Sequence, residues 1–314
     1  MRVGLIDVDG HNFPNIPLMK LSSWHKARGD SVEWYEPLLS GKMDVVYMSK
    51  VFTFSPDYPY YVNAEKIVKG GSGYAIALED GREVYHKERD EPLPQEIEHA
   101  FPDYSIYGIS DTAYGFLTRG CPRACDFCHV AKKEGRCSVK VADLSEFWNG
   151  QKNIVLCDPN LLACKDHIEL LEQLAESGAR VEFNQGLDMR LMNERNLSLL
   201  KRVKLKNIHV AFDRYEDKDI IFEKMRLMKE AGFDRNRGRV SCFLLVNFNT
   251  TLEQDVERAQ ICREFNFNPY VMIYDKEHAA PVYRRLARWC NSPQIFWTCP
   301  TFEEYTTRGK GATA

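Results

Sequence analysis

The sequence predicts an α/β protein in which a small doubly wound, Rossmann-like unit at residues 1–107 precedes a partial (βα)6 TIM-like barrel with a C-terminal extension at residues 108–314. Three observations lead to this prediction. Apolar strands alternate with amphipathic helices in the first part of the chain, a polar stretch between residues 79 and 107 contains three prolines, and six further strands follow it. With 314 residues, 44% of them hydrophobic, the chain can bury a sizeable core.

The elements of the first unit follow from apolar runs that are separated by Gly, Pro and Asp. The sequence predicts strands at 3–7, 31–35 and 44–48, a helix at 16–26, and a segment at 66–69 that runs into Gly70 and Gly71. The polar stretch that follows, from Glu79 to Tyr107, is predicted to be an irregular connector. A domain boundary near residue 108 follows from it.

The second unit shows a more regular alternation of strands and helices. Strands are predicted at 115–118, 153–157, 180–184, 207–212, 239–246 and 269–274. Helices with apolar residues at helical spacing are predicted at 166–177, 194–202, 217–231, 252–265 and 281–289. In a βα barrel the site lies at the C-terminal ends of the strands, so the residues that follow each strand are the candidates for function.

Charge and composition exclude some classes of protein. The formal net charge of -3 gives no overall field toward nucleic acid or an anionic membrane, and no apolar run is long enough to span a bilayer. Two basic patches, 201–206 and 235–239, lie between predicted helices and strands, where solvated connectors are expected rather than an RNA footprint. Ten cysteines without the apolar stretch of a signal peptide indicate a reducing compartment. We therefore expect a cytoplasmic protein.

Three cysteines lie within eight residues directly after the first predicted strand of the second unit: Cys121, Cys125 and Cys128. Three thiolates on a short loop can bind three corners of a cubane iron–sulfur cluster and leave its fourth iron open to a ligand. Structural zinc is the competing interpretation, but zinc sites usually combine two ligand pairs, and here only His129 stands close by as a fourth ligand. A non-catalytic metal-binding or adaptor protein therefore remains the alternative to an enzyme.

The CxxxCxxC spacing, the aromatic Phe127 before the third cysteine and the six βα units resemble the radical S-adenosylmethionine superfamily over roughly residues 108–290. The resemblance implies a 4Fe-4S cluster that binds S-adenosylmethionine at its open iron. It also implies an electron donor such as a reductase, flavodoxin or ferredoxin. Reduction then cleaves the sulfonium and yields a 5′-deoxyadenosyl radical, which abstracts hydrogen from a substrate that the sequence does not identify. The catalytic residues stay unassigned.

The same resemblance suggests cofactor-binding positions. Phe127 occupies the position that contacts the adenine of S-adenosylmethionine in the superfamily. Asp158 and Asn160 lie where many members have a Gly-Gly-Glu segment that binds the methionine amino group. Arg190 is placed to hold a carboxylate, and a solvated loop with a surface Asp188–Arg190 ion pair is the alternative. Asp213 is placed to take a ribose hydroxyl. The remaining candidates at strand ends are Asn184, Gln185, Asn247 and Tyr274.

The first unit resembles, more weakly, the cobalamin-binding domains that precede some radical S-adenosylmethionine domains. The loop Asp9-Gly10-His11 and the later Gly70-Gly71 match their layout, whereas Pro14 stands where the histidine-ligating members have glycine. The resemblance implies a cobalamin-dependent methyltransferase as an alternative function. The competing interpretation is a degenerate Rossmann-like domain that binds no cobalamin and covers the barrel mouth or recognises substrate.

The remaining cysteines show no auxiliary-cluster spacing. Cys242 and Cys262 fall in an apolar strand and helix and are predicted to be core thiols. Cys290 and Cys299, close to an aromatic stretch, are candidates for the substrate side.

Overall fold

The computed structural model describes residues 1–79, 82–235 and 239–306. Its contacts divide the chain into two compact units, residues 1–159 and residues 160–314. A domain division near residue 108, which the sequence predicts, stays a prediction. In the described ranges no helix is both long and apolar enough to cross a membrane.

The first unit is built on a parallel four-stranded sheet. Its strands are β1 (Arg2–Asp7), β2 (Ser31–Trp34), β3 (Met43–Ser49) and β4 (Ala64–Gly70), in the order β2-β1-β3-β4. All three pairings are parallel. The three predicted strands are confirmed to within about a residue, and the segment before the two glycines is β4.

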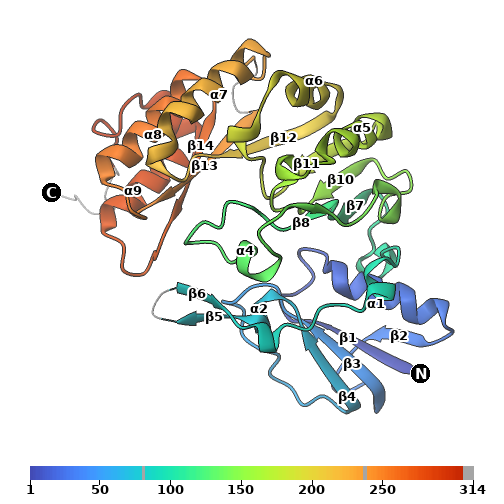
Figure 1. Ribbon diagram of the computed structural model, residues 1–314. Helices are drawn as coiled ribbons and strands as arrows, with labels where there is room; N and C mark the ends of the chain where they lie inside the picture. The colour runs from blue at the N-terminus through green and yellow to red at the C-terminus, as the bar shows by residue number, and fades with distance from the viewer. Residues whose placement is uncertain (80–81, 236–238, 307–314) are drawn as a thin grey trace. The chain divides into compact units, whose positions relative to one another are not determined.

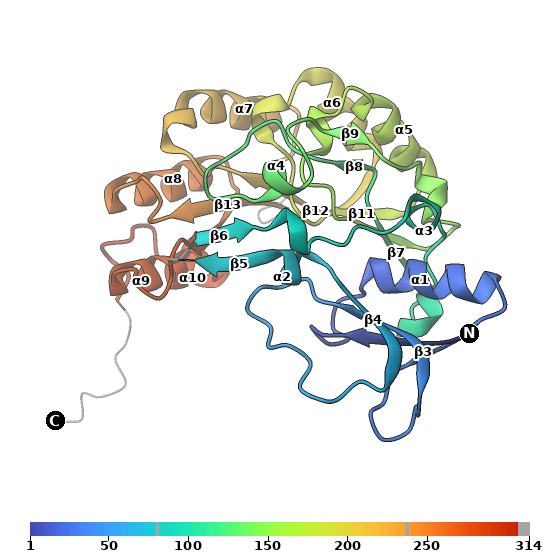
Figure 2. The ribbon, with the colours of Figure 1, turned by 60° about the horizontal axis from the view of Figure 1, so that its bottom comes forward.

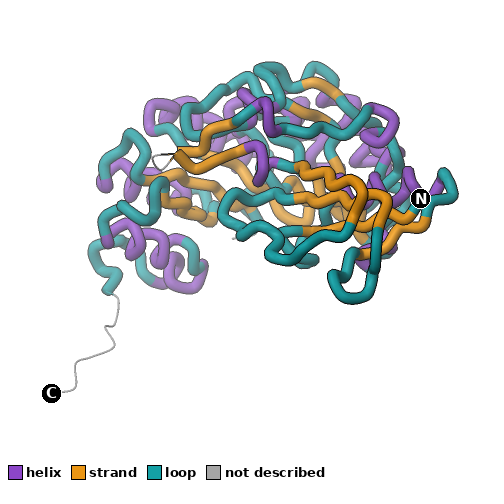
Figure 3. The backbone as a smooth tube through the Cα atoms, turned by 90° about the horizontal axis from the view of Figure 1, so that it is seen from below, coloured by secondary structure: helices purple, strands orange, loops and turns teal. Residues whose placement is uncertain are grey.

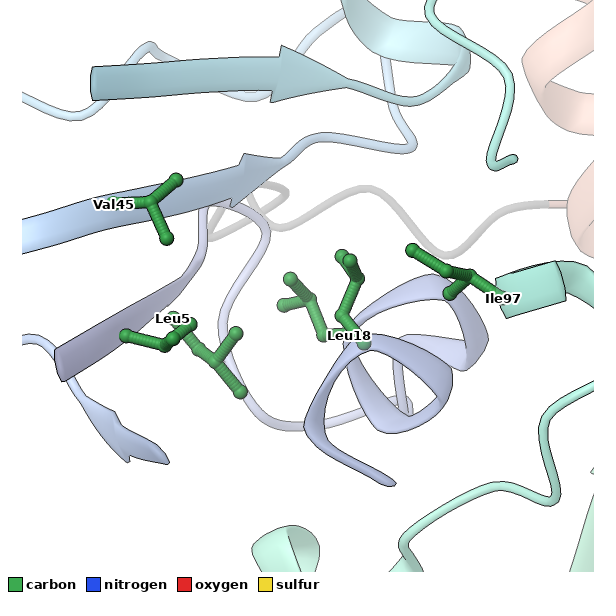
Figure 4. Close-up of a cluster of buried hydrophobic side chains, with 6 residues drawn as sticks. Leu5, Leu18, Val45 and Ile97 are labelled. Atoms are coloured by element: carbon green, nitrogen blue, oxygen red, sulfur yellow. The ribbon is translucent and has the colours of Figure 1, made fainter. Parts of the chain in front are cut away.

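One face of this sheet is covered by the helix α1 (Ile16–Ala27). The side chain of Asn15 accepts a hydrogen bond from the amide of Leu18 and so caps the start of the helix. The short helix α3 (Gln95–Glu98) adds one apolar side chain to the same layer (Figure 4). The buried cluster comprises Val3, Leu5, Leu18, Leu21, Val45 and Ile97.

The opposite face of the sheet is covered by loops. Residues 35–42 and 50–63 join β2 to β3 and β3 to β4, and in Figure 3 the strands near the N-terminus are joined by such loops. Prolines interrupt both connections, at Pro37 and at Pro56 and Pro59, and proline does not fit a helix interior. Buried residues from the sheet and these loops form a second cluster: Ile6, Tyr35, Met43, Val46, Met48 and Val62. A doubly wound arrangement, which needs helices on both faces, is therefore not confirmed.

The predicted irregular connector contains regular structure, so that prediction is wrong in part. The short helix α2 (Ser72–Ala75) is followed by an antiparallel hairpin of β5 (Ile76–Glu79) and β6 (Arg82–Tyr85), whose second strand lies in the predicted connector (Figure 2). α3 and two 3-10 turns, Lys87–Arg89 and Tyr104–Tyr107, follow. Period-two alternation over so few residues was too weak a signal to predict the hairpin.

The first predicted barrel strand is displaced. Instead of 115–118, the strand β7 spans Thr112–Gly115 and pairs in parallel with β10 (Asn153–Leu156). Beyond Gly115 the chain forms β8 (Thr118–Arg119), which pairs antiparallel with β9 (Val139–Lys140). The helix α4 (Val130–Lys133) lies between β8 and β9 in the chain.

The second unit contains a parallel ladder. Its strands are β11 (Arg180–Phe183), β12 (Lys204–Ala211), β13 (Val240–Val246) and β14 (Asn268–Ile273). Its helices are α5 (His167–Ser177), α6 (Glu194–Arg202), α7 (Lys218–Glu230), α8 (Leu252–Glu264), α9 (Pro281–Cys290) and α10 (Pro293–Thr298). The predicted alternation is confirmed in element type and order (Figure 1). A partial TIM-like barrel is not confirmed, because the described strands form a mixed α/β fold with parallel sheets and no closed barrel.

Candidate functional site

The three predicted cluster cysteines lie on one loop, residues 120–138, whose base is closed by the pairing of β8 with β9. The amide of Cys121 donates to the carbonyl of Gly135 at 3.1 Å, and the amide of Cys128 donates to the carbonyl of Cys125 at 3.0 Å. All three cysteines are half-buried. The paired base of the loop and the turn from Cys125 to Cys128 thus hold the three cysteines in one short segment.

Gly120 is required where this loop begins. Its φ of +85° is a left-handed conformation, and a Cβ there would lie 2.1 Å from the carbonyl oxygen of Cys137. A backbone oxygen cannot move aside as a flexible side chain can. Only glycine therefore allows the two ends of the cysteine loop to approach this closely.

We expect Gly120→Ala to open the cysteine loop and lower the iron that the protein retains after anaerobic reconstitution. Gly135→Ala is the matched control, because Gly135 also has a positive φ, +100°, yet a Cβ there meets no atom within 4 Å. Both variants carry the backbone strain, about 1 kcal/mol, and only the first adds a clash. Equal iron content in the two variants would contradict the requirement.

Polar contacts also fix the flanks of the loop. Glu134 accepts from the Arg119 guanidinium at 3.0 Å and from the amide of Gly120 at 3.1 Å. His129 Nδ1 lies 2.8 Å from a carboxylate oxygen of Glu83 on β6. One ring nitrogen of His129 therefore has a partner other than the thiols, which weakens its case as a zinc ligand.

The donor set of the loop fits an iron–sulfur cluster, because thiolates are the ligands that such clusters use. Across residues 1–79, 82–235 and 239–306, no three His, Cys, Asp or Glu side chains converge on a preformed metal site. The assignment of Cys121, Cys125 and Cys128 as ligands stays a prediction. Phe127, half-buried on the same loop, likewise keeps its predicted adenine contact as a prediction.

Asp158, which follows β10, is buried and binds the backbone beyond β7. Its carboxylate accepts from the amides of Leu117 and Thr118, and from the Thr118 hydroxyl at 2.7 Å. These bonds draw residues 117–118 away from the line of β7, which explains why the strand ends at Gly115. Burial raises the pKa of Asp158 to about 6, although its hydrogen bonds to Thr118 and Leu117 act in the opposite direction.

This pKa makes stability depend on pH. Between about pH 4 and pH 6 the folded chain holds the Asp158 proton that the unfolded chain has released, so stability falls as pH rises through that range, by on the order of 3 kcal/mol in total. We expect the wild type to gain about 1 kcal/mol over Asp158→Asn between pH 7 and pH 5, measured by urea unfolding. Parallel pH profiles for the two proteins would show that Asp158 does not titrate there.

A polar network lies after β11 in the second unit. The Arg190 guanidinium contacts both carboxylate oxygens of Asp188, at 2.8 and 3.3 Å, and a carboxylate oxygen of Asp217 at 2.7 Å. Asn160 donates to Asp188 at 3.2 Å. The side chain of Asp188 is only 5% exposed and that of Arg190 20%, so this is no surface ion pair on a solvated loop. Arg190 does hold a carboxylate in the predicted manner, but that carboxylate belongs to the protein.

Asp213 follows β12 and accepts from the amide of Leu245 at 2.9 Å. Burial raises its pKa, and the charges of Arg258 and Arg190 act in the opposite direction. Asp213 therefore lies within electrostatic reach of the Arg190 network. A raised pKa at a strand end is a property shared by many functional carboxyl groups.

Asn184 and Gln185 occupy a tight turn after β11 in which the amide of Gly186 donates to the carbonyl of Phe183 at 3.1 Å. Asn184 is half-buried and Gln185 is exposed. The structure thus brings Asn160, Asp188, Arg190 and Asp213 toward one strand-end site. Gln185 remains accessible to a ligand.

Two candidates at strand ends have backbone partners. Asn247, at φ +64°, donates from its side chain to the carbonyl of Tyr274 at 3.0 Å, so it joins the ends of β13 and β14. The amide of Asn247 donates to Asp255, which pairs with Arg258 on α8. Sequence reasoning missed Asp217, Asp255 and Arg258. The i,i+3 spacing of the last two on a predicted helix was the one available signal.

The other cysteines, outside the loop, differ in how deeply each is buried. Cys242 and Cys262 are 0% exposed, which confirms them as core thiols. Cys290 is buried as well, and the thiol of Cys299 donates to the carbonyl of Thr301 at 3.4 Å. Of the basic patches, Lys201 and Arg202 end α6 and Lys204 begins β12, so the first patch lies at the ends of regular elements and not in the predicted connector. Residues 236–238 of the second patch lie outside the described residues.

No protein-family model and no curated protein matches the chain. Among solved structures, the fold is similar to that of a radical S-adenosylmethionine methyltransferase. That protein is TsrM from Kitasatospora setae, solved with cobalamin and a [4Fe-4S] cluster bound. The TM-score is 0.57 at 10% identity, over 87% of this chain and 72% of TsrM. At this identity the likeness concerns the fold.

Proposed function

We propose that this chain is a radical S-adenosylmethionine enzyme whose 4Fe-4S cluster is held by Cys121, Cys125 and Cys128. The observation that carries the proposal is the three-thiol loop with its closed base, in a chain whose fold is similar to that of a radical S-adenosylmethionine methyltransferase. When bound, the cluster and cosubstrate supply the reductive cleavage of the sulfonium to methionine and a 5′-deoxyadenosyl radical.

In this proposal the residues of the chain hold the cysteine loop and position the cosubstrate. Arg119, Gly120 and Glu134 hold the loop at its entrance. Since the Arg190 guanidinium is already bound by Asp188 and Asp217, it orients these carboxylates, and the second carboxylate oxygen of Asp217 can accept from the cosubstrate amine or ribose. Asp213 serves the same purpose, and Asn160, Asn184 and Gln185 offer amide groups. An intracellular reductase, flavodoxin or ferredoxin is the electron donor in this proposal.

The decisive test is cosubstrate cleavage. Protein purified without oxygen and loaded with iron and sulfide should be brown, and with dithionite and S-adenosylmethionine it should yield 5′-deoxyadenosine. A fully loaded cluster that cleaves none of the cosubstrate would overturn the enzyme proposal. Colourless protein with tightly bound zinc would favour the alternative, a non-catalytic adaptor.

A cobalamin-dependent methyltransferase is the second candidate, and it rests on the cobalamin that TsrM holds. In this chain the His11 ring lies 4.3 Å from the Trp34 ring and 5.6 Å from the Tyr107 ring, which fixes the loop after β1. Spectroscopic titration of the full chain with hydroxocobalamin tests this candidate. No binding by either wild type or His11→Ala would remove it, whereas binding lost only in the variant would assign His11 as the contact.

A further inference from the structure

A buried lysine lies at the carboxyl end of the first sheet. Lys50 directly follows β3 and is only 8% exposed. Its ammonium lies 5.7 Å from the centre of the Tyr74 ring, and in the described part of the chain it forms no ion pair or hydrogen bond. It is also not among the fully enclosed side-chain atoms that lack a partner, so its tip keeps access to solvent. The neighbours of Lys50 therefore cover most of the residue, while its ammonium contacts no carboxylate of the described residues and stays accessible to an anionic ligand.

The glycine-rich segment after β4 covers this lysine. A Cβ on Gly71 would lie 2.3 Å from the Lys50 carbonyl oxygen, and a Cβ on Gly73 would lie 2.6 Å from the Lys50 Cγ and 2.7 Å from the Phe52 carbonyl oxygen. The amide of Gly73 donates to the Lys50 carbonyl at 2.9 Å. The absence of side chains at these positions is therefore what lets the loop lie on Lys50.

More cationic groups border the same loop. The Lys133 ammonium donates to the Ser72 hydroxyl at 2.6 Å, which leaves the hydroxyl proton free to donate onward. Lys69 lies 5.2 Å from the Tyr74 ring and pairs with Asp57 at 2.8 Å. Asp57 also accepts from the Tyr74 hydroxyl, so its oxygens are engaged away from Lys50.

Acidic groups nearby are likewise engaged. The Asp9 carboxylate accepts from the amides of Val51 and Phe52, next to Lys50. Asp90 accepts from the Tyr85 hydroxyl at 2.9 Å, and Glu134 holds the entrance of the cysteine loop. Among the described residues, no carboxylate contacts the charge of Lys50, and the ammonium of Lys133 contacts the Ser72 hydroxyl instead of a carboxylate.

Aromatic rings stand beside the loop. The rings of Phe52 and Phe54 stack with their centres 5.1 Å apart, and they are 44% and 82% exposed. The Phe52 carbonyl packs against Gly73, which places this pair next to the lysine. Exposed aromatic rings beside cations are suited to stack a nucleobase whose phosphate the cations bind.

We propose that the carboxyl edge of the first sheet is a nucleotide-binding site, in which Lys50 and the Ser72 hydroxyl bind a phosphate and the Phe52–Phe54 pair stacks the base. The nucleotide is either free or part of a larger cofactor. Parallel α/β sheets commonly bind ligands at this edge, where the strand order reverses, here between β1 and β3. Lys133, which bonds the Ser72 hydroxyl, lies on the cysteine loop, whereas Lys50 and the Phe52–Phe54 pair do not, and the proposal does not require a bound cluster.

Thermal unfolding of the full chain with increasing AMP, inorganic phosphate or hydroxocobalamin tests it. AMP should raise the Tm of the wild type, because a ligand that binds the folded state alone stabilises it. Lys50→Met should lose that shift, with at least a tenfold weaker affinity for AMP. Lys66→Met, at an exposed lysine of β4, is the matched control and should keep it.

The apo proteins add a second readout. Lys50→Met should melt no lower than wild type without ligand, since the Lys50 ammonium forms no ion pair or hydrogen bond with the described residues that the substitution would remove, and methionine keeps the apolar stem packed. Phe54→Ala should weaken the binding of AMP but leave the Tm shift with inorganic phosphate unchanged. A Lys50-dependent shift with hydroxocobalamin alone would assign the nucleotide to a larger cofactor. No shift with any of the three ligands, an AMP shift that survives in Lys50→Met, or a clear loss of apo stability in that variant would overturn the proposal.

Discussion

Replacing Cys128 by alanine should abolish both cluster retention and formation of 5′-deoxyadenosine. Three thiolates are the smallest set that can hold a cubane at three corners, so loss of one leaves two irons without a protein ligand. The loss should exceed the roughly 10–100-fold effect typical of removing a group that merely supports a metal ligand. Iron and sulfide analysis after anaerobic reconstitution, followed by the cleavage assay, measures it.

Cys137→Ala is the matched control for that experiment. Cys137 lies on the same loop and is exposed, and its contribution to the base of the loop, the carbonyl that approaches Gly120, survives the substitution. It should therefore load and cleave as the wild type does. If Cys128→Ala kept its cluster, or if Cys137→Ala lost it equally, the assignment of Cys121, Cys125 and Cys128 as the ligand set would be wrong.

The alternation of strands and helices could be predicted because it depends on local patterns. Helix α6, for example, is predicted at 194–202 and observed at Glu194–Arg202, since Asn193 caps it and its buried leucines recur at helical spacing. The end of β7 could not be predicted in this way. It depends on Asp158, about forty residues further along the chain, whose carboxylate accepts from the amides of Leu117 and Thr118.

The same limit applies to the strand-end site. The residues after β11 could be identified as candidates because strand ends carry function in βα folds. The partner of Arg190 could not, because Asp217 lies 27 positions away at the start of α7 and no local pattern links the two. The buried Lys50 is a similar case, since only the close approach of Gly71 and Gly73 reveals that the lysine is covered.

Arg258 is the side chain whose removal should cost the second unit most stability. It is fully buried on α8, where it donates to the carbonyls of Phe212 and Leu245, after β12 and near the end of β13, and pairs with the buried Asp255. Arg258→Met leaves Asp255 as an unpaired buried charge. We expect the free energy of unfolding to fall by about 3–5 kcal/mol, as measured by urea titration with circular dichroism.

Arg226→Met is the control, because Arg226 forms an exposed i,i+4 pair with Glu230 on α7 and should change stability by less than about 0.5 kcal/mol. Adding Asp255→Asn to Arg258→Met should restore part of the loss if the unpaired charge causes it, and no part if lost packing does. The effect reaches the strand-end site, since the charge of Arg258 opposes the burial that raises the pKa of Asp213. Arg258→Met should therefore raise that pKa further, and a decrease in stability of under about 1 kcal/mol would show that the strand ends do not depend on this arginine.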